Sequence, residues 1–139
     1  MAKKNILIID GQGGGIGRQL VSGIKEKLPD CTVTAGGTNS AATSAMLKAG
    51  AVNAPTGENA VKVGCRHADV ISGPVGIVIA DSLFGEITPA MAVSVGQSNA
   101  KRVLIPVNHC DNIVVGVNDL TVGRLVDAAV AEIGRICGE

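Results

Sequence analysis

The densest group of chemically reactive side chains in the sequence is the tetrapeptide Asn108, His109, Cys110 and Asp111. An imidazole, a thiol and a carboxylate are the groups that form a metal site, or a thiol nucleophile with its base. His109 and Cys110 are neighbours, however, so in extended backbone their side chains point to opposite sides. The alternative interpretation is that these residues line a pocket or complete a turn. His109 and Cys110 are therefore the candidate catalytic residues, and no metal site is predicted.

A second stretch with chemical potential is rich in glycine and lies between an apolar run and an amphipathic segment. Glycines permit positive φ and a close approach of the backbone to a ligand. The N-terminus of a helix also presents unpaired N–H groups and the positive end of the macrodipole. The stretch therefore predicts a seat for a phosphate, or alternatively a tight turn that binds nothing. The candidate binding residues are Asp10, Gly11, Gln12, Gly13, Gly14, Gly15, Ile16 and Gly17.

The hydrophobic pattern predicts alternating strands and helices. Strands are expected over residues 5–10, 31–35, 68–72, 102–107 and 113–117, the last two being central strands. Helices are expected over residues 16–28, 41–49, 56–67 and 90–95, and from 119 or 121 to 136. Residues 75–84 fit a helix or a strand, and we favour a helix beginning after Pro74. Polar residues predict helix caps at 38–40, Thr56 and Thr88, whereas Gly36-Gly37 and Gly73-Pro74 are expected to end strands.

This alternation is typical of an α/β fold, here a three-layer Rossmann-like, doubly wound and mainly parallel sheet within one domain spanning residues 1–139. Ligands of such folds bind beyond the C-terminal ends of the strands. The polar residues that follow the other predicted strands are therefore added to the candidate binding site. They are Thr38, Asn39 and Ser40, then Ser72, Gly73 and Pro74, and finally Asn108.

The composition excludes several classes of partner. Lys and Arg total 12, as do Asp and Glu, and the chain has one Phe and no Trp or Tyr, so nucleic-acid binding is not expected. No apolar run approaches the roughly 18 residues of a membrane span, and no leader of signal-peptide length precedes the first strand. We therefore expect a cytoplasmic protein without membrane contact. The four cysteines lack CxxC spacing, which favours free thiols.

The glycine stretch resembles the cofactor loop of short-chain dehydrogenases. Gly11, Gly15 and Gly17 follow the GxxxGxG spacing within the sequence IIDGQGGGIGRQLV. The resemblance implies NAD or NADP as cofactor, and otherwise another phosphate-bearing nucleotide. It covers about the first 25 residues. The chain has no Tyr for that family's catalytic Tyr-x-x-x-Lys, and no acidic residue follows the second predicted strand to bind a ribose. The stretch is also similar to the first glycine loop of tubulin-like GTPases, whose GGGTGTG loop is absent.

Across most of its length the chain resembles a family of short bacterial proteins that is catalogued as a domain of unknown function. The segments that carry this resemblance are IDGQGGGIG, GTNSAATSAMLKAGA, TGENA, ADVISGPVGIVIADSLFGEIT and LIPVNHCDNIVVGV. The resemblance implies one intact domain and no particular activity.

The remaining polar residues give weaker signals. Glu58 and Asn59 fit the first turn of a helix, or alternatively a pocket in which they bind a sugar or a base. Asp81 and Glu86 are five residues apart and do not share a helical face, so they are not predicted to act as an acid–base pair.

Three functions are consistent with the sequence. The first is a binding domain for a small-molecule nucleotide. The second is a small enzyme that uses His109 and Cys110 on a phosphorylated substrate, and the third is a non-catalytic oligomeric sensor or subunit. The predicted helices at 41–49 and 90–95 expose few charges, which favours a homodimer or higher homo-oligomer.

Overall fold

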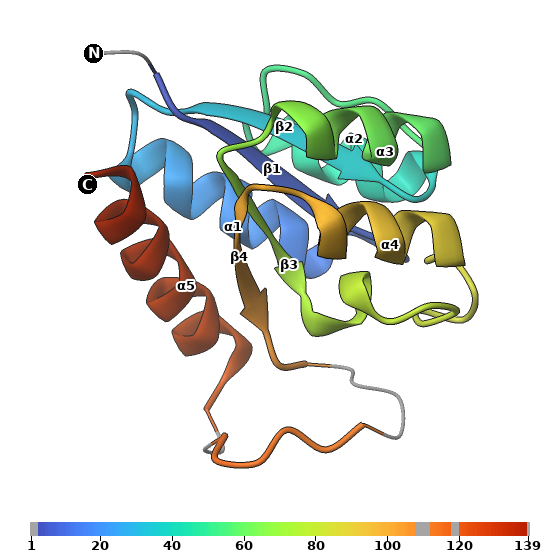
Figure 1. Cartoon of the computed structure of the whole chain (residues 1–139). Coiled ribbons are helices and arrows are strands. Elements are labelled where there is room, and N and C mark those ends of the chain that lie inside the picture. The colour runs from blue at the N-terminus through green and yellow to red at the C-terminus, as the bar shows by residue number, and fades with distance from the viewer. Residues whose placement is uncertain (1–2, 108–111, 118–119, 139) are drawn as a thin grey trace.

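The computed structural model describes residues 3–107, 112–117 and 120–138. Strands and helices alternate along most of the chain, as Figure 1 shows. In chain order they are β1 (Asn5–Asp10), α1 (Gly15–Lys27), β2 (Thr32–Gly37), α2 (Ser40–Lys48), α3 (Glu58–His67), β3 (Val70–Pro74), the 3₁₀ helix η1 (Val75–Val78), α4 (Pro89–Gln97), β4 (Lys101–Ile105) and α5 (Val122–Cys137).

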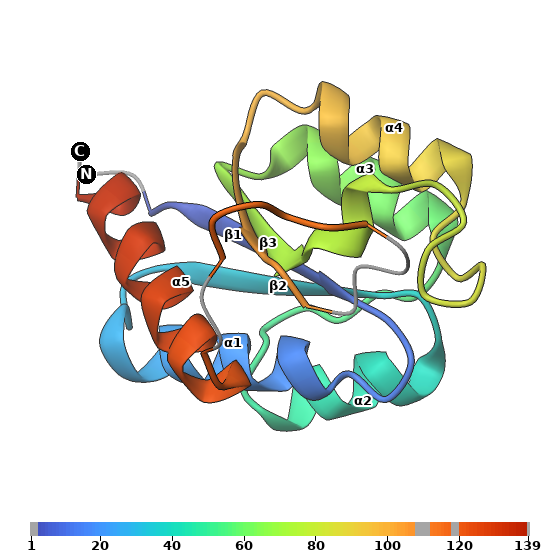
Figure 2. The ribbon, with the colours of Figure 1, turned by 90° about the horizontal axis from the view of Figure 1, so that it is seen from below.

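The four strands form one parallel sheet in the order β2-β1-β3-β4. β1 is central, and its side chains alternate between two apolar clusters. Ile6 and Ile8 pack with α1, α2 and α5, whereas Leu7 and Ile9 pack with α3 and α4. The helices therefore cover both faces of the sheet (Figure 2). This arrangement confirms the predicted three-layer, Rossmann-like fold.

The connections after β1 and β3 leave the sheet on opposite faces. The chain passes from β1 into α1 on one face, and from β3 through η1 into α4 on the other. Because β1 and β3 are neighbours in the sheet, their connections diverge from adjacent strand ends, and a pocket lined by Asp10 and Pro74 lies there. Ligands of open parallel sheets bind at such a switch point.

Two of the predicted helix caps, Asn39 and Thr88, are confirmed, and Thr121 caps α5 in the same way. The side chains of Asn39, Thr88 and Thr121 accept hydrogen bonds from backbone N–H groups in the first turns of α2, α4 and α5. The prediction that Thr56 caps the third helix is wrong. Gly57 holds that position with φ 102°, and the Thr56 hydroxyl lies 2.6 Å from the hydroxyl of Thr43.

Two glycine-containing turns are in fact parts of strands. Gly36 and Gly37 extend β2, because the following segment pairs with its end in an isolated parallel bridge between Gly37 and Thr56. Gly73 and Pro74 extend β3 and pair with Leu104 and Ile105 of β4. Neighbouring backbone comes close to Gly37 and Gly73. Local sequence patterns do not reveal these tertiary contacts.

The C-terminal part of the predicted sheet also needs correction. β4 is an edge strand that ends at Ile105, and residues 113–117 form no strand. Ile113 and Val115 are 89% and 92% exposed, so they lack the packing that stabilises a strand. Residues 75–84 begin as the 3₁₀ helix and continue as turns, because Asp81, Leu83 and Phe84 all have positive φ.

Within the described ranges, no helix combines the length and the apolar character that crossing a bilayer requires.

Candidate functional site

The glycine stretch forms a tight loop between β1 and α1, beside the pocket described above. Gly14 precedes α1 with φ 71°, and its N–H donates to the carbonyl oxygen of Gly11 at 2.9 Å. A Cβ at Gly14 would lie 2.9 Å from the backbone of Ala42, and one at Gly17 would lie 2.6 Å from the Sδ atom of Met46. The loop geometry and the packing of α1 on α2 therefore require glycine at these two positions.

Asp10 closes the loop from inside. Its Oδ1 accepts from the N–H of Gly11 at 2.8 Å, and its Oδ2 accepts from the N–H of Gly17 at 2.7 Å. The side chain is 5% exposed, and burial raises the pKa of Asp10 above its ordinary 3.8, although hydrogen bonds from Gly17, Gly11 and Ile16 act in the opposite direction. Asp10 thus uses N–H groups that were expected to face a ligand.

Glu86 brings a second carboxylate to the loop from the segment after β3. Its Oε1 accepts three hydrogen bonds: from the hydroxyl of Thr38 at 2.6 Å, from Nδ2 of Asn39 at 2.6 Å and from the N–H of Gln12 at 3.0 Å. Burial alone would raise the pKa of Glu86, but these three donors lower it below its ordinary 4.5. Thr38 and Asn39 follow β2. The Glu86 carboxylate therefore links the segments that follow β1, β2 and β3.

The segment that carries Glu86 has an unusual backbone. Leu83 and Phe84 have φ of 55° and 54°, a region that non-glycine residues rarely adopt. Hydrogen bonds from Asp81 N–H to Ile87 O at 2.7 Å and from Glu86 N–H to Leu83 O at 3.1 Å hold the turn together. Leu83 and Ile87 are buried beneath it. Packing and hydrogen bonding therefore fix Glu86 in place.

Gly13 and Gly15 differ from the other glycines of the loop. Neither has positive φ, and a Cβ at either position would meet nothing within 4 Å. Neither backbone N–H finds an acceptor among the residues that the structure describes. Both line a pocket of about 210 Å³ formed by the loop together with Pro74 and Leu83. The fold does not require glycine at these positions, and their N–H groups are open to a ligand.

Some of the other predicted site residues have structural roles, and the rest lie outside the part of the chain that the structure describes. Ser72 is fully buried and donates to the carbonyl oxygen of Val103 at 2.7 Å, so it has a structural role. Gly73 permits close packing of β3 on β1, and Ser40 begins α2. Asn108, His109 and Cys110 lie outside the described residues. Within the described ranges, no three His, Cys, Asp or Glu side chains gather in a way that could hold a metal ion.

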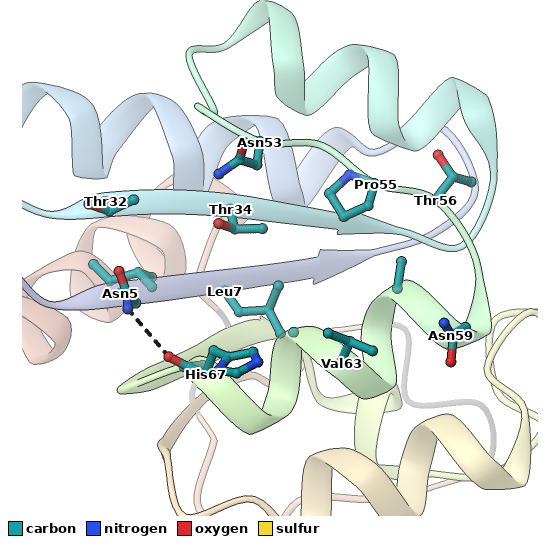
Figure 3. Close-up of a pocket in the computed structure, with 14 residues that line it drawn as sticks. Asn5, Leu7, Thr32, Thr34, Asn53, Pro55, Thr56, Asn59, Val63 and His67 are labelled. Carbon is teal, nitrogen blue, oxygen red and sulfur yellow. Dashed lines mark hydrogen bonds between the residues drawn. The ribbon is translucent and has the colours of Figure 1, made fainter.

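Glu58 and Asn59 do not reach the glycine-loop pocket. The carboxylate of Glu58 accepts a hydrogen bond from the hydroxyl of Thr88 at the start of α4. Asn59 lines a different groove of about 620 Å³ between α3 and β2 (Figure 3). Thr32 and Thr34 of β2 line this groove together with Val63 and Gly64 of α3.

Two of the described cysteines are poor nucleophiles. Burial raises the pKa of Cys65 to about 11. Burial and the neighbouring Cys31 raise the pKa of Cys137 to about 11. Both are therefore protonated at neutral pH, and the thiolate is the form that reacts.

The sequence from residue 5 to residue 138 matches a family described as Domain of unknown function (DUF3842). The chain belongs to this family. The match confirms the resemblance to a domain of unknown function that spans most of the chain, and in this DUF3842 chain it includes every described element of the site. No curated protein matches the sequence.

Glu86 gives this DUF3842 chain a pH-dependent contribution to stability. Because the pKa of Glu86 is lowered on folding, its stabilising effect is present above 4.5 and is lost as the pH falls through the folded-state value. Glutamine keeps an oxygen for the three donors but loses the charge, so Glu86→Gln should lower the free energy of unfolding by about 1 kcal/mol at pH 7.

Urea denaturation of both proteins, followed by circular dichroism, measures this difference. It should remain constant from pH 7 to pH 6 and narrow below pH 4.5. A difference that stayed the same down to pH 3 would show that the Glu86 charge contributes nothing. The Asp81→Asn variant, in which an exposed carboxylate of the same segment is neutralised, serves as the control.

Proposed function

We propose that this protein binds a phosphate-bearing nucleotide, NAD or NADP, at the glycine loop. The proposal rests on the open surroundings and the unpaired N–H groups of Gly13 and Gly15. Both are glycines that the fold does not need, and both present a free N–H to a pocket at the switch point of the sheet. The absence of a side chain there is explained if a phosphate lies against the backbone.

The electrostatics of the loop support a phosphate at the N-terminus of α1. The N-terminus of α1 carries a partial positive charge, which favours an anion at Gly15, the first residue of that helix. The carboxylates of Asp10 and Glu86 accept hydrogen bonds from the amides of Gly11, Gln12 and Gly17 in the same loop. A phosphate therefore fits at the amides of Gly13 and Gly15, which neither carboxylate uses.

The variant Gly15→Ala separates binding from folding. Alanine at the start of α1 meets no atom within 4 Å and should raise the free energy of unfolding by about 0.5 kcal/mol, because it reduces the freedom of the unfolded chain. The added methyl group would occupy the place of the phosphate. The increase in melting temperature that NAD or NADP gives the wild type should therefore disappear in the variant.

Scanning calorimetry is the suitable measurement, because the chain has no Trp or Tyr. Gly96→Ala in α4 is the matched control, since a Cβ at Gly96 also meets nothing within 4 Å and lies far from the loop. Gly96→Ala should keep the full ligand effect. The proposal is contradicted if Gly15→Ala keeps it too, or if NAD, NADP, AMP and ATP all leave the wild-type melting temperature unchanged.

We also propose that the protein acts as a homo-oligomer in the cytoplasm. Leu47 of α2 and Val93 of α4 are each 52% exposed, and apolar residues on such surfaces commonly contact a partner. Cys31, Cys65 and Cys137 are free, which suits a reducing compartment. Light scattering at micromolar concentration should give at least twice the mass of one chain, and the mass of a single chain would contradict the oligomer.

A further inference from the structure

We infer that two copies of this chain associate by docking the exposed apolar segment 113–117 of each copy into the groove between α3 and β2 of the other. The inference rests on the homo-oligomer proposed above and names its two surfaces. It does not depend on the nucleotide site. Each copy supplies one segment and one groove, so the contact is reciprocal and closes in a dimer.

The first observation is the concentration of exposed apolar side chains in the connection between β4 and α5. Six of the eleven large apolar residues that are exposed in the described part of the chain fall within residues 113–122. Ile113 and Val115 are the most exposed of these six, and residues 112–117 contain no charged side chain. Exposed apolar residues that lie together commonly mark a surface that binds another protein.

The backbone of this segment is also available for contacts. The N–H and C=O groups of Ile113 and Val115 form no hydrogen bond with another residue that the structure describes. Backbone groups that become buried in a contact need hydrogen-bond partners. The segment therefore fits a surface that combines apolar side chains with hydrogen-bond donors and acceptors.

The second observation is that the groove between α3 and β2 has this chemistry. It measures about 620 Å³, and no Asp, Glu, Lys or Arg is among the residues that line it. Leu7, Pro55 and Val63 supply apolar surface, and Figure 3 shows Pro55 and Val63 on opposite walls. A groove of this size without charged side chains favours an uncharged, partly apolar occupant over a charged one.

The polar side chains of the groove suit a peptide backbone. Thr34, Asn53 and Asn59 line it, and their side chains form no hydrogen bond with another described residue. An amide side chain donates and accepts, as a peptide group does, and a hydroxyl has both functions too. These side chains are placed to bind the backbone of the entering segment, while Leu7 and Val63 contact its apolar side chains.

The two surfaces lie at opposite ends of the molecule. In Figure 1 the segment, drawn in orange, lies at the bottom beyond the end of β4, whereas β2 and α3 lie at the top. The connection that contains the segment is held at both ends, because β4 pairs with β3 and α5 packs in the same apolar cluster as α1. The segment therefore reaches the groove of a second copy and not that of its own chain.

Complementation between two charged variants tests the inference. Val115→Asp places a negative charge on the segment, and Val63→Lys places a positive charge on the wall of the groove. Both positions are exposed in the single chain, so both variants should fold, but in the dimer each charge would be buried without a partner. Each substitution alone should raise the dissociation constant of the dimer by at least about a hundredfold.

Light scattering at micromolar concentration should give twice the mass of one chain for the wild type and the mass of one chain for each variant. An equimolar mixture of the two variants should recover the double mass. The mixed dimer has one unaltered contact, and its other contact pairs Asp with Lys. Val93→Asp in α4 is the matched control, because it charges another exposed valine, and it should keep the dimer.

The other outcomes overturn the inference in distinguishable ways. A single-chain mass for the wild type removes the oligomer and the inference together. A dimer that survives both Val115→Asp and Val63→Lys leaves the oligomer standing and removes these two surfaces. Dissociation by Val93→Asp alone places the interface on α4. Dissociation of both variants without recovery in the mixture, while circular dichroism shows both to be folded, means that the segment and the groove do not contact each other.

Discussion

Replacement of Gly73 by alanine is expected to lower the free energy of unfolding by about 3 kcal/mol, the largest effect among the variants considered. A Cβ at Gly73 would lie 2.2 Å from the backbone oxygen of Ile9. Neither the added Cβ nor the Ile9 oxygen can move away easily, because β3 and β1 are hydrogen-bonded neighbours in the centre of the sheet. Accommodating the methyl group requires the two strands to separate at the site.

Gly36→Ala is the matched control, because Gly36 is also a buried glycine in a strand. A Cβ there meets its closest neighbour, Cγ2 of Val61, at 3.4 Å, which is an ordinary contact. Its effect should stay below about 1 kcal/mol. Urea denaturation followed by circular dichroism measures both variants. Similar midpoints for Gly73→Ala and the wild type would show that the strands can separate without cost.

Removal of the Asp10 carboxylate is expected to have the next largest effect. Asp10→Ala leaves the buried N–H groups of Gly11 and Gly17 without their acceptor, and each charge-assisted hydrogen bond is worth about 1.5–3 kcal/mol. Part of this loss is offset because a buried carboxylate no longer has to be desolvated. The free energy of unfolding should therefore fall by about 2 kcal/mol, and the loop should lose its nucleotide-induced stabilisation.

The pH dependence of Asp10 should have the opposite sign to that of Glu86. Burial raises the pKa of Asp10 above 3.8, so its contribution to stability is full below 3.8 and declines as the pH rises through the folded-state value. The destabilisation by Asp10→Ala should consequently be larger at pH 3.5 than at pH 7. Denaturation of Asp10→Ala and of Asp30→Ala, an exposed control, at both pH values measures this. A smaller destabilisation at pH 3.5 would contradict it.

Much of the fold could be predicted from the sequence because its local signals are strong. β1 has the expected limits, 5–10, since its residues are apolar on both faces, as in a central strand. Asn39, Thr88 and Thr121 mark helix starts through their own side chains. The alternation of these elements was enough to predict parallel strands between two helical layers. Residues 113–117 have the same β-branched composition as a strand, but the sequence does not show that they lack a neighbour.

The candidate site was only partly predictable, because its key contacts join distant parts of the chain. The glycine loop was recognisable from its own residues. Glu86 lies 74 residues from Gln12 and 47 from Asn39, and nothing in its local sequence indicates that it reaches them. The different roles of the loop glycines also depend on tertiary contacts: Gly14 and Gly17 face the backbone or side chains of α2 and β1, whereas Gly13 and Gly15 face open space.

Titration of the ¹⁵N-labelled protein with NAD, followed by amide NMR, tests whether the nucleotide binds at the glycine loop. The amide signals of Gly13 and Gly15 should shift most, with smaller changes at Gln12 and in the first turn of α1. Shifts centred instead on Thr34, Asn53 and Asn59, which line the groove beside β2, would place the ligand elsewhere. That result, or the absence of any shift, would contradict a nucleotide site at the glycine loop.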